Sequence, residues 1–448
     1  MDPASLALAE RSAPRYTSYP TAPHFSKSIG CGETQSWLAS LAPEASLSLY
    51  LHVPFCAEIC AYCGCHTKAV RQDAPLEAYV ETLKSEIALT SRATRARRVT
   101  SIHWGGGTPG IIGASRFAAV VSVLRDHFDL SSGTEHAIEL DPRLLEADLV
   151  EALGAAGVTR ASLGVQDLNA HVQEASGRIQ PYETVARAVQ LLRDGGVTAI
   201  NLDLMYGLPK QSVEDAARTA SLAASLQPQR LAVFGYAHVP WFKSNQKLID
   251  AAALPGAGER LAQAATMRET LENAGFVAIG LDHFARPDDP LAVAAREKRM
   301  RRNFQGYTTD AADALLPFGV SSIGRLPQGY VGNAADLAGW RRAIESARFA
   351  TTRGLAFTRE DIARAELIER LMCDFDVDFG AVAARHGYAE QAFDSAQASL
   401  DALAADGVIE LWRRRVAVTE RGKPFVRLVA AAFDAYLQAA PARHSSAV

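Results

Sequence analysis

Four of the six cysteines in this 448-residue chain fall within ten positions. They are Cys56, Cys60, Cys63 and Cys65, spaced CX3CX2C with one more cysteine two residues on. Six cysteines are too few for a disulfide scaffold, so a thiol-rich loop indicates metal binding or catalysis. Thiolates are soft ligands that favour zinc, copper(I) and iron–sulfur clusters. This loop is therefore the first place in the sequence where chemistry is expected.

The spacing within the loop bears on the kind of metal site. A structural zinc site normally pairs two short Cys or His motifs that lie apart along the chain, and this sequence has no second pair. A [4Fe–4S] cluster held by three cysteines fits the compact triplet and leaves one iron open. We therefore expect Cys56, Cys60 and Cys63 to hold a cluster, with zinc as the alternative. Cys65 stays open between a fourth ligand, a catalytic thiol and a packed thiol.

The elements that must position this loop follow from the periodicity of the sequence. Seven β-rich runs alternate with stretches whose apolar residues recur every three or four positions, as in helices. This alternation predicts an α/β fold with a parallel sheet, and six or seven units suit a complete or partial barrel. The β-rich runs are 47–53, 99–105, 136–141, 160–166, 197–207, 230–239 and 276–284.

Polar or glycine-rich stretches follow nearly every predicted strand. In a parallel α/β fold, the loops after the carboxyl ends of the strands meet at one face, where ligands bind. The cysteine loop follows the first strand, and a GGGTP stretch at 105–109 follows the second. We therefore expect one large site at that face.

The pattern divides the chain into three parts. Residues 1–46 form an arm that we expect to close the barrel mouth, and 47–350 carry the βα series. Residues 351–448 change to helices with one short hairpin, which predicts a small helical, winged-helix-like C-terminal domain. The predicted fold is thus a partial (β/α)6-type barrel with an arm at one end and a helical domain at the other.

Composition excludes some classes of partner. The chain has 46 Lys and Arg against 50 Asp and Glu, a net charge of −4, so we expect no attraction to nucleic acid. The longest apolar runs are shorter than the roughly 18 residues that a membrane span requires, and residues 1–20 lack the basic and continuous apolar regions of a signal peptide. We therefore predict a cytoplasmic protein without a membrane span, and take a monomer as the default.

The order of two motifs resembles the radical S-adenosylmethionine (SAM) superfamily. In that superfamily a CX3CX2C loop follows the first strand of a βα series, and a glycine-rich loop follows the second. This chain has both motifs on the corresponding loops. The resemblance implies that SAM binds the open iron of the cluster.

Longer stretches of sequence are similar to one family in that superfamily, the oxygen-independent coproporphyrinogen III oxidases. The similarity covers nearly the whole chain, including the arm and the C-terminal domain. The matching stretches are 15–21 (RYTSYPT), 50–65, 103–109 (HWGGGTP), 139–143 (ELDPR), 164–167 (GVQD), 203–211 (DLMYGLPKQ), 236–238 (YAH), 282–289 (DHFARPDD) and 303–309 (NFQGYTT).

This resemblance implies a reaction and its cofactors. Two propionate side chains of coproporphyrinogen III become vinyl groups with loss of two CO₂, which gives protoporphyrinogen IX in haem biosynthesis. No side-chain base removes hydrogen from an unactivated carbon, so a cofactor must carry the step. The implied cofactors are a [4Fe–4S] cluster and two SAM molecules per chain. A reductant and an electron acceptor are also implied, and no motif identifies either.

The resemblance also assigns residues by position. Tyr50, Glu139 and Cys65 are the implied catalytic residues. The SAM on the cluster would be contacted by Tyr50, Tyr62, Gly106, Glu139 and Ile323, and the second SAM by Gly107, Thr108, Gln166, Arg178, Asp203 and Ala237.

The implied substrate carries four carboxylates, so cationic side chains should converge on it. Arg15, Lys210 and Arg286 lie in the shared stretches and are the candidates. Each has an alternative role as a surface or loop-stabilising charge.

Other functions of the same superfamily remain as alternatives. Haem-trafficking relatives carry the cluster motif without this activity, but they lack the RYTSYPT arm and the last cysteine of the CXC, both of which this chain has. A radical SAM enzyme that methylates or opens the haem ring is a second alternative. An iron–sulfur redox sensor is a third, and it would not need the SAM-type loops.

Overall fold

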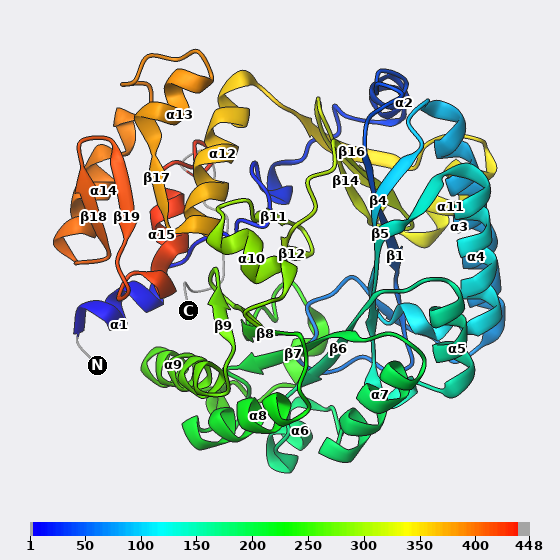
Figure 1. Cartoon of the computed structure of the whole chain (residues 1–448), viewed down its shortest axis with the longest axis horizontal. Helices are drawn as coiled ribbons and strands as arrows, with labels where there is room; N and C mark the ends of the chain where they lie inside the picture. The colour runs from blue at the N-terminus through cyan, green and yellow to red at the C-terminus, as the bar shows by residue number, and fades with distance from the viewer. Residues whose placement is uncertain (1–2, 438–448) are drawn as a thin grey trace.

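A sheet of twelve strands organises residues 3–437, the part of the chain that the computed structural model describes (Figure 1). Six neighbouring strands at its centre are parallel, and a helix follows each of them. This is the partial (β/α)6-type barrel that the sequence predicts. The strands are β1 (Leu47–Val53), β4 (Arg98–Gly106), β5 (Asp129–Leu140), β6 (Arg160–Gln166), β7 (Ala199–Tyr206) and β8 (Arg230–Gly235).

Helices cover the outside of the parallel strands (Figure 1). Apolar side chains of their inward faces pack with the strands in one continuous core. The six helices are α3 (Asp73–Ala93), α4 (Ala114–His127), α5 (Ala147–Ala155), α7 (Tyr182–Asp194), α8 (Val213–Ser225) and α9 (Ala257–Asn273).

The pleat of β1 separates packing residues from residues free for chemistry. Leu47, Leu49 and Leu51 are fully buried in the main core. Because successive side chains of a strand point to opposite faces, Tyr50 and His52 lie on the other face, where the Tyr50 hydroxyl is 3.0 Å from His52 Nδ1. The inner face of the barrel therefore carries polar side chains.

The seventh predicted strand, 276–284, does not extend the parallel series. It forms two short strands, β9 (Val277–Ile279) and β10 (His283–Ala285), which pair antiparallel with each other, and β10 also pairs antiparallel with β8. Gly280 makes the reversal, because its φ of +55° suits glycine. The tyrosine ring of Tyr307 also fills the space where a side chain at this position would lie.

On the far side of β1 the sheet continues with β13 (Ala314–Phe318), which is parallel to β1. Beyond it lie three antiparallel strands, β14 (Ile323–Leu326), β15 (Gly329–Asn333) and β16 (Thr351–Ala356). Helix α11 (Leu337–Glu345) connects the last two. The central barrel is thus extended at both edges by antiparallel strands.

The C-terminal part combines helices with a small antiparallel sheet. Its strands pair in the order β17 (Asp376–Asp378), β19 (Arg415–Val418) and β18 (Ile409–Trp412). Its helices are α12 (Arg359–Asp374), α13 (Phe379–Arg385), α14 (Gln397–Ala405) and α15 (Val426–Ala431). The final stretch of the predicted domain, 438–448, lies outside the described residues.

The N-terminal arm shares the hydrophobic core of this C-terminal part. Leu8 of α1 (Pro3–Glu10), Tyr16 and Tyr19 are buried there. The Tyr16 hydroxyl donates a hydrogen bond to Asp434 Oδ2 at 2.9 Å. The arm and the described end of the C-terminal part therefore lie side by side, as the blue and red segments of Figure 1 show.

Candidate active site

The CX3CX2C loop lies directly after β1, between β2 (Phe55–Cys56) and β3 (Lys68–Ala69). These two short strands pair with each other and pin the ends of the loop. Between them the chain turns tightly, and the Cys63 N–H donates to Cys60 O at 3.1 Å. The three cysteines are thus gathered on one turn at the carboxyl end of the first barrel strand.

Hydrogen-bond donors from the end of the same loop and from two other loops point at the first two sulfurs. Cys56 Sγ accepts from Thr67 Oγ1 at 3.2 Å and from Thr108 Oγ1 at 3.5 Å. Cys60 Sγ accepts from Arg178 Nη1 at 3.4 Å. Such donors stabilise thiolates and tune the potential of a cluster that they hold.

The third sulfur, Cys63 Sγ, accepts from the Cys65 N–H at 3.4 Å. Hydrogen bonding from Cys65 lowers the pKa of the Cys63 thiol to about 6, although burial opposes this. Cys65 itself is exposed, and its carbonyl accepts from Lys243 Nζ at 2.9 Å. Each sulfur of the triplet thus accepts a hydrogen bond, as ligand thiolates do, although burial raises the pKa of the Cys56 thiol.

These thiols fit a cluster better than a single metal ion. In residues 3–437 no three His, Cys, Asp or Glu side chains come close enough to bind one ion. A cluster spreads its thiolate ligands over several iron atoms, so its cysteines need not converge on one point. The donor set of the loop, three cysteine thiols on one turn, therefore fits a cluster.

Two side chains that the motifs do not reveal hold the backbone of the cysteine loop. Asn245 Nδ2 donates to three loop carbonyls, those of Cys60, Ala61 and Cys63, at 3.1, 3.1 and 2.9 Å. Gln246 Nε2, which is buried, donates to Tyr62 O at 2.8 Å and to Ala237 O at 3.2 Å. The loop after β8 therefore fixes the loop after β1. A lone Asn-Gln pair in a polar loop gave no sequence signal for this role.

Glu139, the last residue but one of β5, lies beside the glycine-rich stretch that ends β4. Its carboxylate accepts from the Gly106 N–H at 3.2 Å and lies 3.1 Å from His103 Nε2. Burial raises the pKa of the Glu139 carboxyl, but the interactions with His103 and Gly106 lower it by a larger amount. The pKa therefore lies below the ordinary value for a glutamate. Although it lies inside the barrel, 39% of its side-chain surface is accessible. Glu139 is therefore a carboxylate that lines an internal space.

The glycines of the GGGTP stretch let backbone and side chains approach closely. At Gly105, an added Cβ would lie 2.8 Å from the Glu139 carboxylate and 3.1 Å from the Tyr50 ring. At Gly107, it would lie 2.5 Å from Phe55 O. The Gly107 N–H also donates to Val53 O at 2.8 Å, which ties this loop to the start of the cysteine loop.

A second group of predicted residues gathers around Gly164 on β6. A Cβ at Gly164 would lie 2.9 Å from Gln166 Nε2 and 3.5 Å from Arg178 Nη2. On β7, Asp203 accepts from Ser162 Oγ at 2.7 Å, and burial raises its pKa to about 6. These polar side chains line the barrel next to Glu139, because Ser162 is the β6 residue whose Cα pairs with that of Glu139.

Ile323 reaches the same face from the antiparallel extension. It begins β14, and the neighbouring Gly324 packs against Pro317, whose Cα pairs with Tyr50. The structure thus brings the predicted contacts of the cluster-bound SAM to the carboxyl ends of the strands.

The three candidate substrate cations separate in space. Arg15 reaches the face, where its Nη2 donates to Gly235 O at 3.3 Å. Lys210 is exposed in the loop after β7. Arg286 lies at the other end of the barrel: its N–H donates to Gln229 O at 3.0 Å, and its guanidinium stacks on a phenylalanine ring. Arg286 thus lies away from the face that carries the site, as its alternative role of a loop-stabilising charge implies, because β10 runs antiparallel and carries it to the amino end of β8.

Comparison with known families agrees with this arrangement. Residues 50–223 match the family model of the radical SAM superfamily, and residues 357–425 match that of the HemN C-terminal domain. The barrel and its cysteine loop define a radical SAM protein.

Relatives at the level of the whole chain narrow the class. The oxygen-independent coproporphyrinogen III oxidase of Bradyrhizobium diazoefficiens is 49% identical over 99% of both chains. That of Escherichia coli K12 is 38% identical over 97% of this chain and 95% of its own. A solved structure of coproporphyrinogen III oxidase from Escherichia coli, described as a radical SAM enzyme, has a TM-score of 0.90 and 37% identity over 94% of this chain and 98% of its own. This chain belongs to the family of oxygen-independent coproporphyrinogen III oxidases.

Proposed function

We propose that this chain oxidises coproporphyrinogen III to protoporphyrinogen IX in haem biosynthesis. Each of two propionate side chains loses one hydrogen atom, one electron and CO₂ and becomes a vinyl group. One observation carries the proposal: the three cysteine sulfurs, each with a hydrogen-bond donor, lie at the same face as the Glu139 carboxylate. Relatives named for this activity match nearly the full chain.

The family implies a [4Fe–4S] cluster and SAM, and the thiols of the loop fit the cluster. When bound, these groups supply the one-electron chemistry that removes hydrogen from an unactivated carbon. Cys56, Cys60 and Cys63 would hold the cluster. Glu139 stays ionised beside the Gly106 N–H and has lone pairs left for the ammonium group of SAM.

Two further residues complete the proposed catalytic set. Tyr50 stacks on His103, with ring centroids 6.0 Å apart, and would form one wall of the SAM pocket with Tyr62 and Ile323. Cys65 has an exposed thiol next to a cluster ligand, and we assign it a role on the reacting groups. In a Cys65→Ser variant the cluster absorbance should persist while turnover falls. A changed cluster spectrum would instead make Cys65 a fourth ligand.

We also propose a second SAM molecule per chain. Its implied contacts Gln166, Arg178 and Asp203 line the barrel together beside the first site. Gly107, Thr108 and Ala237 lie on loops hydrogen-bonded to the cysteine loop or to its anchor, which supports a pocket adjoining the cluster. Equilibrium dialysis of the reconstituted protein with labelled SAM should give two molecules per chain, and a plateau at one would contradict this.

The deciding experiment is an anaerobic assay. Protein with a reconstituted cluster is given SAM, a chemical reductant and coproporphyrinogen III, and products are separated by chromatography. We expect protoporphyrinogen IX and 5′-deoxyadenosine. SAM cleavage without vinyl formation would exclude the proposed reaction but keep the superfamily. Stoichiometric haem binding without turnover would favour the trafficking alternative.

The proposed reaction also needs partners outside this chain. An external one-electron reductant and an electron acceptor are needed for the balance of the reaction. We also propose a monomer in the cytoplasm, where the six free thiols of the chain would stay reduced. Light scattering of the purified protein tests the monomer. Among residues 3–437, none of the helices has the length and apolar character to cross a bilayer.

A further inference from the structure

Arginines from separate parts of the chain gather at the carboxyl ends of β7 and β8. Arg260, on the first turn of α9, donates from Nη2 to Tyr236 O at 2.8 Å. Arg15 of the arm donates to Gly235 O, the carbonyl of the preceding residue. The two guanidinium groups therefore bind adjacent carbonyls just where the barrel strand ends.

A third guanidinium approaches the same stretch of the arm. Arg302, in the short strand β11 (Arg301–Asn303), donates to Arg15 O at 3.4 Å and to Tyr16 O at 3.1 Å. Its guanidinium also lies over the ring of Tyr307, 4.3 Å from the centroid. We call Arg15, Arg260 and Arg302 the arginine cluster.

The backbone is shaped to admit Arg260. A Cβ at Gly207, directly after β7, would lie 2.7 Å from Arg260 Nη1. A Cβ at Gly235, the last residue of β8, would lie 3.3 Å from Nη2 and 2.9 Å from the Tyr206 hydroxyl. Two strand ends therefore lack side chains where this guanidinium lies, so the charge reaches the face that carries the site.

The arginine cluster lacks matching carboxylates. Within the described chain, no Asp or Glu side chain forms an ion pair with any of its three members, and the buried N–H groups Arg260 Nε and Arg302 Nη1 have no hydrogen-bond partner. The charge of Asp282 reaches Arg15 and Arg302, but its carboxylate lies 2.6 Å from His283 Nδ1. Arg15 is exposed, whereas Arg260 and Arg302 are partly buried. Cations withdrawn from water normally have a counter-charge, so this group is set up for an anion.

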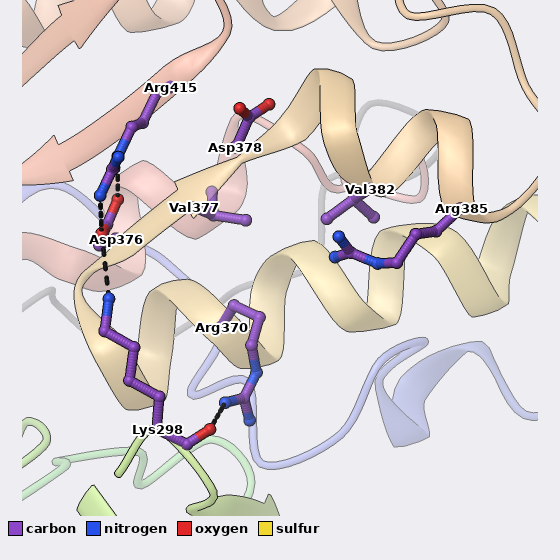
Figure 2. A pocket seen from close by; sticks show the side chains of 8 residues that line it. All are labelled: Lys298, Arg370, Asp376, Val377, Asp378, Val382, Arg385 and Arg415. Carbon is purple, nitrogen blue, oxygen red and sulfur yellow. Dashed lines mark hydrogen bonds and ion pairs between the residues drawn. The ribbon is translucent and has the colours of Figure 1, made fainter. Parts of the chain in front are cut away.

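A cavity of about 220 Å³ in the C-terminal part offers a contrast (Figure 2). Cations line this cavity too, but each of the four has a carboxylate partner within ion-pair distance. The pairs are Lys298 and Arg415 with Asp376, Arg370 with Asp374, and Arg385 with Glu366.

We propose that the arginine cluster binds the carboxylates of coproporphyrinogen III that are not undergoing reaction. The inference rests on the proposed function, which supplies a substrate with four carboxylates. The reacting propionate must face the cysteine loop and Glu139. The arginine cluster instead lies at the carboxyl ends of β7 and β8, where the arm reaches the barrel. Binding the distant carboxylates there orients the ring and leaves one propionate at the reactive end.

The test measures binding, so it does not depend on turnover. Coproporphyrin III, the oxidised porphyrin with the same four carboxylates, is titrated by fluorescence into the native holoprotein and into Arg260→Gln and Arg302→Gln variants. Loss of a charge-assisted hydrogen bond should raise Kd roughly ten- to hundredfold. Arg260→Lys keeps the charge and should recover part of the affinity. Arg268→Gln, about two turns along the same helix, is the matched control and should leave Kd unchanged, because Arg268 lies over Phe284 and pairs with Glu272.

An uncharged probe separates recognition from a damaged fold. The tetramethyl ester of the same porphyrin has the ring without the charges, and both titrations contain the same mild detergent. Its Kd should be equal for native protein and variants. Unchanged binding of the acid by both glutamine variants would overturn the proposal. An equal loss for acid and ester would overturn it too, since the arginines would then only support the fold.

The outcomes also distinguish this proposal from the reaction itself. Native protein that binds the acid through these arginines but forms no protoporphyrinogen IX would exclude the reaction and keep the carboxylate site. If the native protein forms protoporphyrinogen IX and the variants bind coproporphyrin III with unchanged Kd, the reaction is kept and the carboxylate site is excluded. Variants that lose SAM but not coproporphyrin III would overturn the proposal, because the carboxylate held would then be that of SAM.

Discussion

At the scale of single residues, Gly106 makes the contact between the glycine loop and Glu139. Its φ is +115°, and an added Cβ would lie 2.7 Å from the His52 ring and 2.9 Å from Val53 O. Both the backbone conformation and the missing side chain are therefore required at this position. The Gly106 N–H points at Glu139 only while this conformation is kept.

A Gly106→Ala variant should lose both stability and SAM binding. The strained backbone alone costs roughly 1–3 kcal/mol, and the contact with Val53 O adds to it because backbone atoms cannot move aside. Gly113→Ala is the matched control, since its φ is +81° but nothing lies within 4 Å of its added Cβ. Urea unfolding and SAM titration of both variants check this. Equal effects in the two would show that the close contact is unimportant.

A buried carboxylate on α3 predicts a pH dependence. Glu86 of α3 is 3% exposed and accepts from Gly319 N at 2.6 Å and Asn333 Nδ2 at 2.7 Å. Burial raises its pKa from 4.5 to about 7 in the folded protein. Its contribution to stability is therefore full below pH 4.5 and is lost as the pH rises through about 7. The loss amounts to roughly 3 kcal/mol.

Unfolding measured between pH 5 and 8 should show this loss in the native protein, and Glu86→Gln should flatten the pH profile because the amide does not titrate. A variant with the same slope as the native protein would mean that other groups cause the dependence.

At the scale of elements, the loop after β8 controls the loop after β1. Asn245 makes this contact, because its side-chain amide donates hydrogen bonds to three carbonyls of the cysteine loop. Asn245→Ala leaves these carbonyls without their donor and should loosen the turn that carries the thiols. We expect a reconstituted iron–sulfur cluster to be lost several-fold faster in air. The loss is measured by the absorbance of the cluster and by the iron content of the protein. The unfolding midpoint should change little.

Lys247→Ala is the control for this prediction, since Lys247 lies exposed on the same short 3-10 helix. Equal cluster lifetimes in the two variants would mean that the cysteine loop does not need its anchor.

The elements also show what sequence patterns can and cannot predict. The six parallel strands were predictable because apolar runs alternate with helical periods, and CX3CX2C was predictable because the ligands are adjacent in sequence. The hairpin at Gly280 was not, since a β-rich run does not record strand direction. For the same reason the two roles of Arg286 stayed open. Asn245 and Arg260 act through contacts with residues far away in sequence, which no local spacing reveals.

At the scale of the whole molecule, the arm is held by the C-terminal part. The hydrogen bond from Tyr16 to Asp434 joins two buried side chains. Tyr16→Phe leaves the Asp434 carboxylate with one hydrogen-bond donor fewer. This should weaken the free energy with which the arm docks on the C-terminal part by about 1–3 kcal/mol. Hydrogen exchange should then speed up across the arm and around Asp434, with the barrel strands unchanged. Tyr388→Phe, in the same C-terminal part, is the control. Equal exchange in the arm of both variants would contradict a role for this bond.

The same contact sets an order of events during synthesis. Tyr16 and Asp434 are 418 positions apart, so the arm leaves the ribosome long before its partner exists. At usual elongation rates the delay is roughly 20–80 s. Within that interval the barrel strands and the cysteine loop are synthesised, but the C-terminal residues that bind the arm are not. Delivery of iron and sulfide to the nascent protein thus has an open period, which ends when Asp434 emerges from the ribosome.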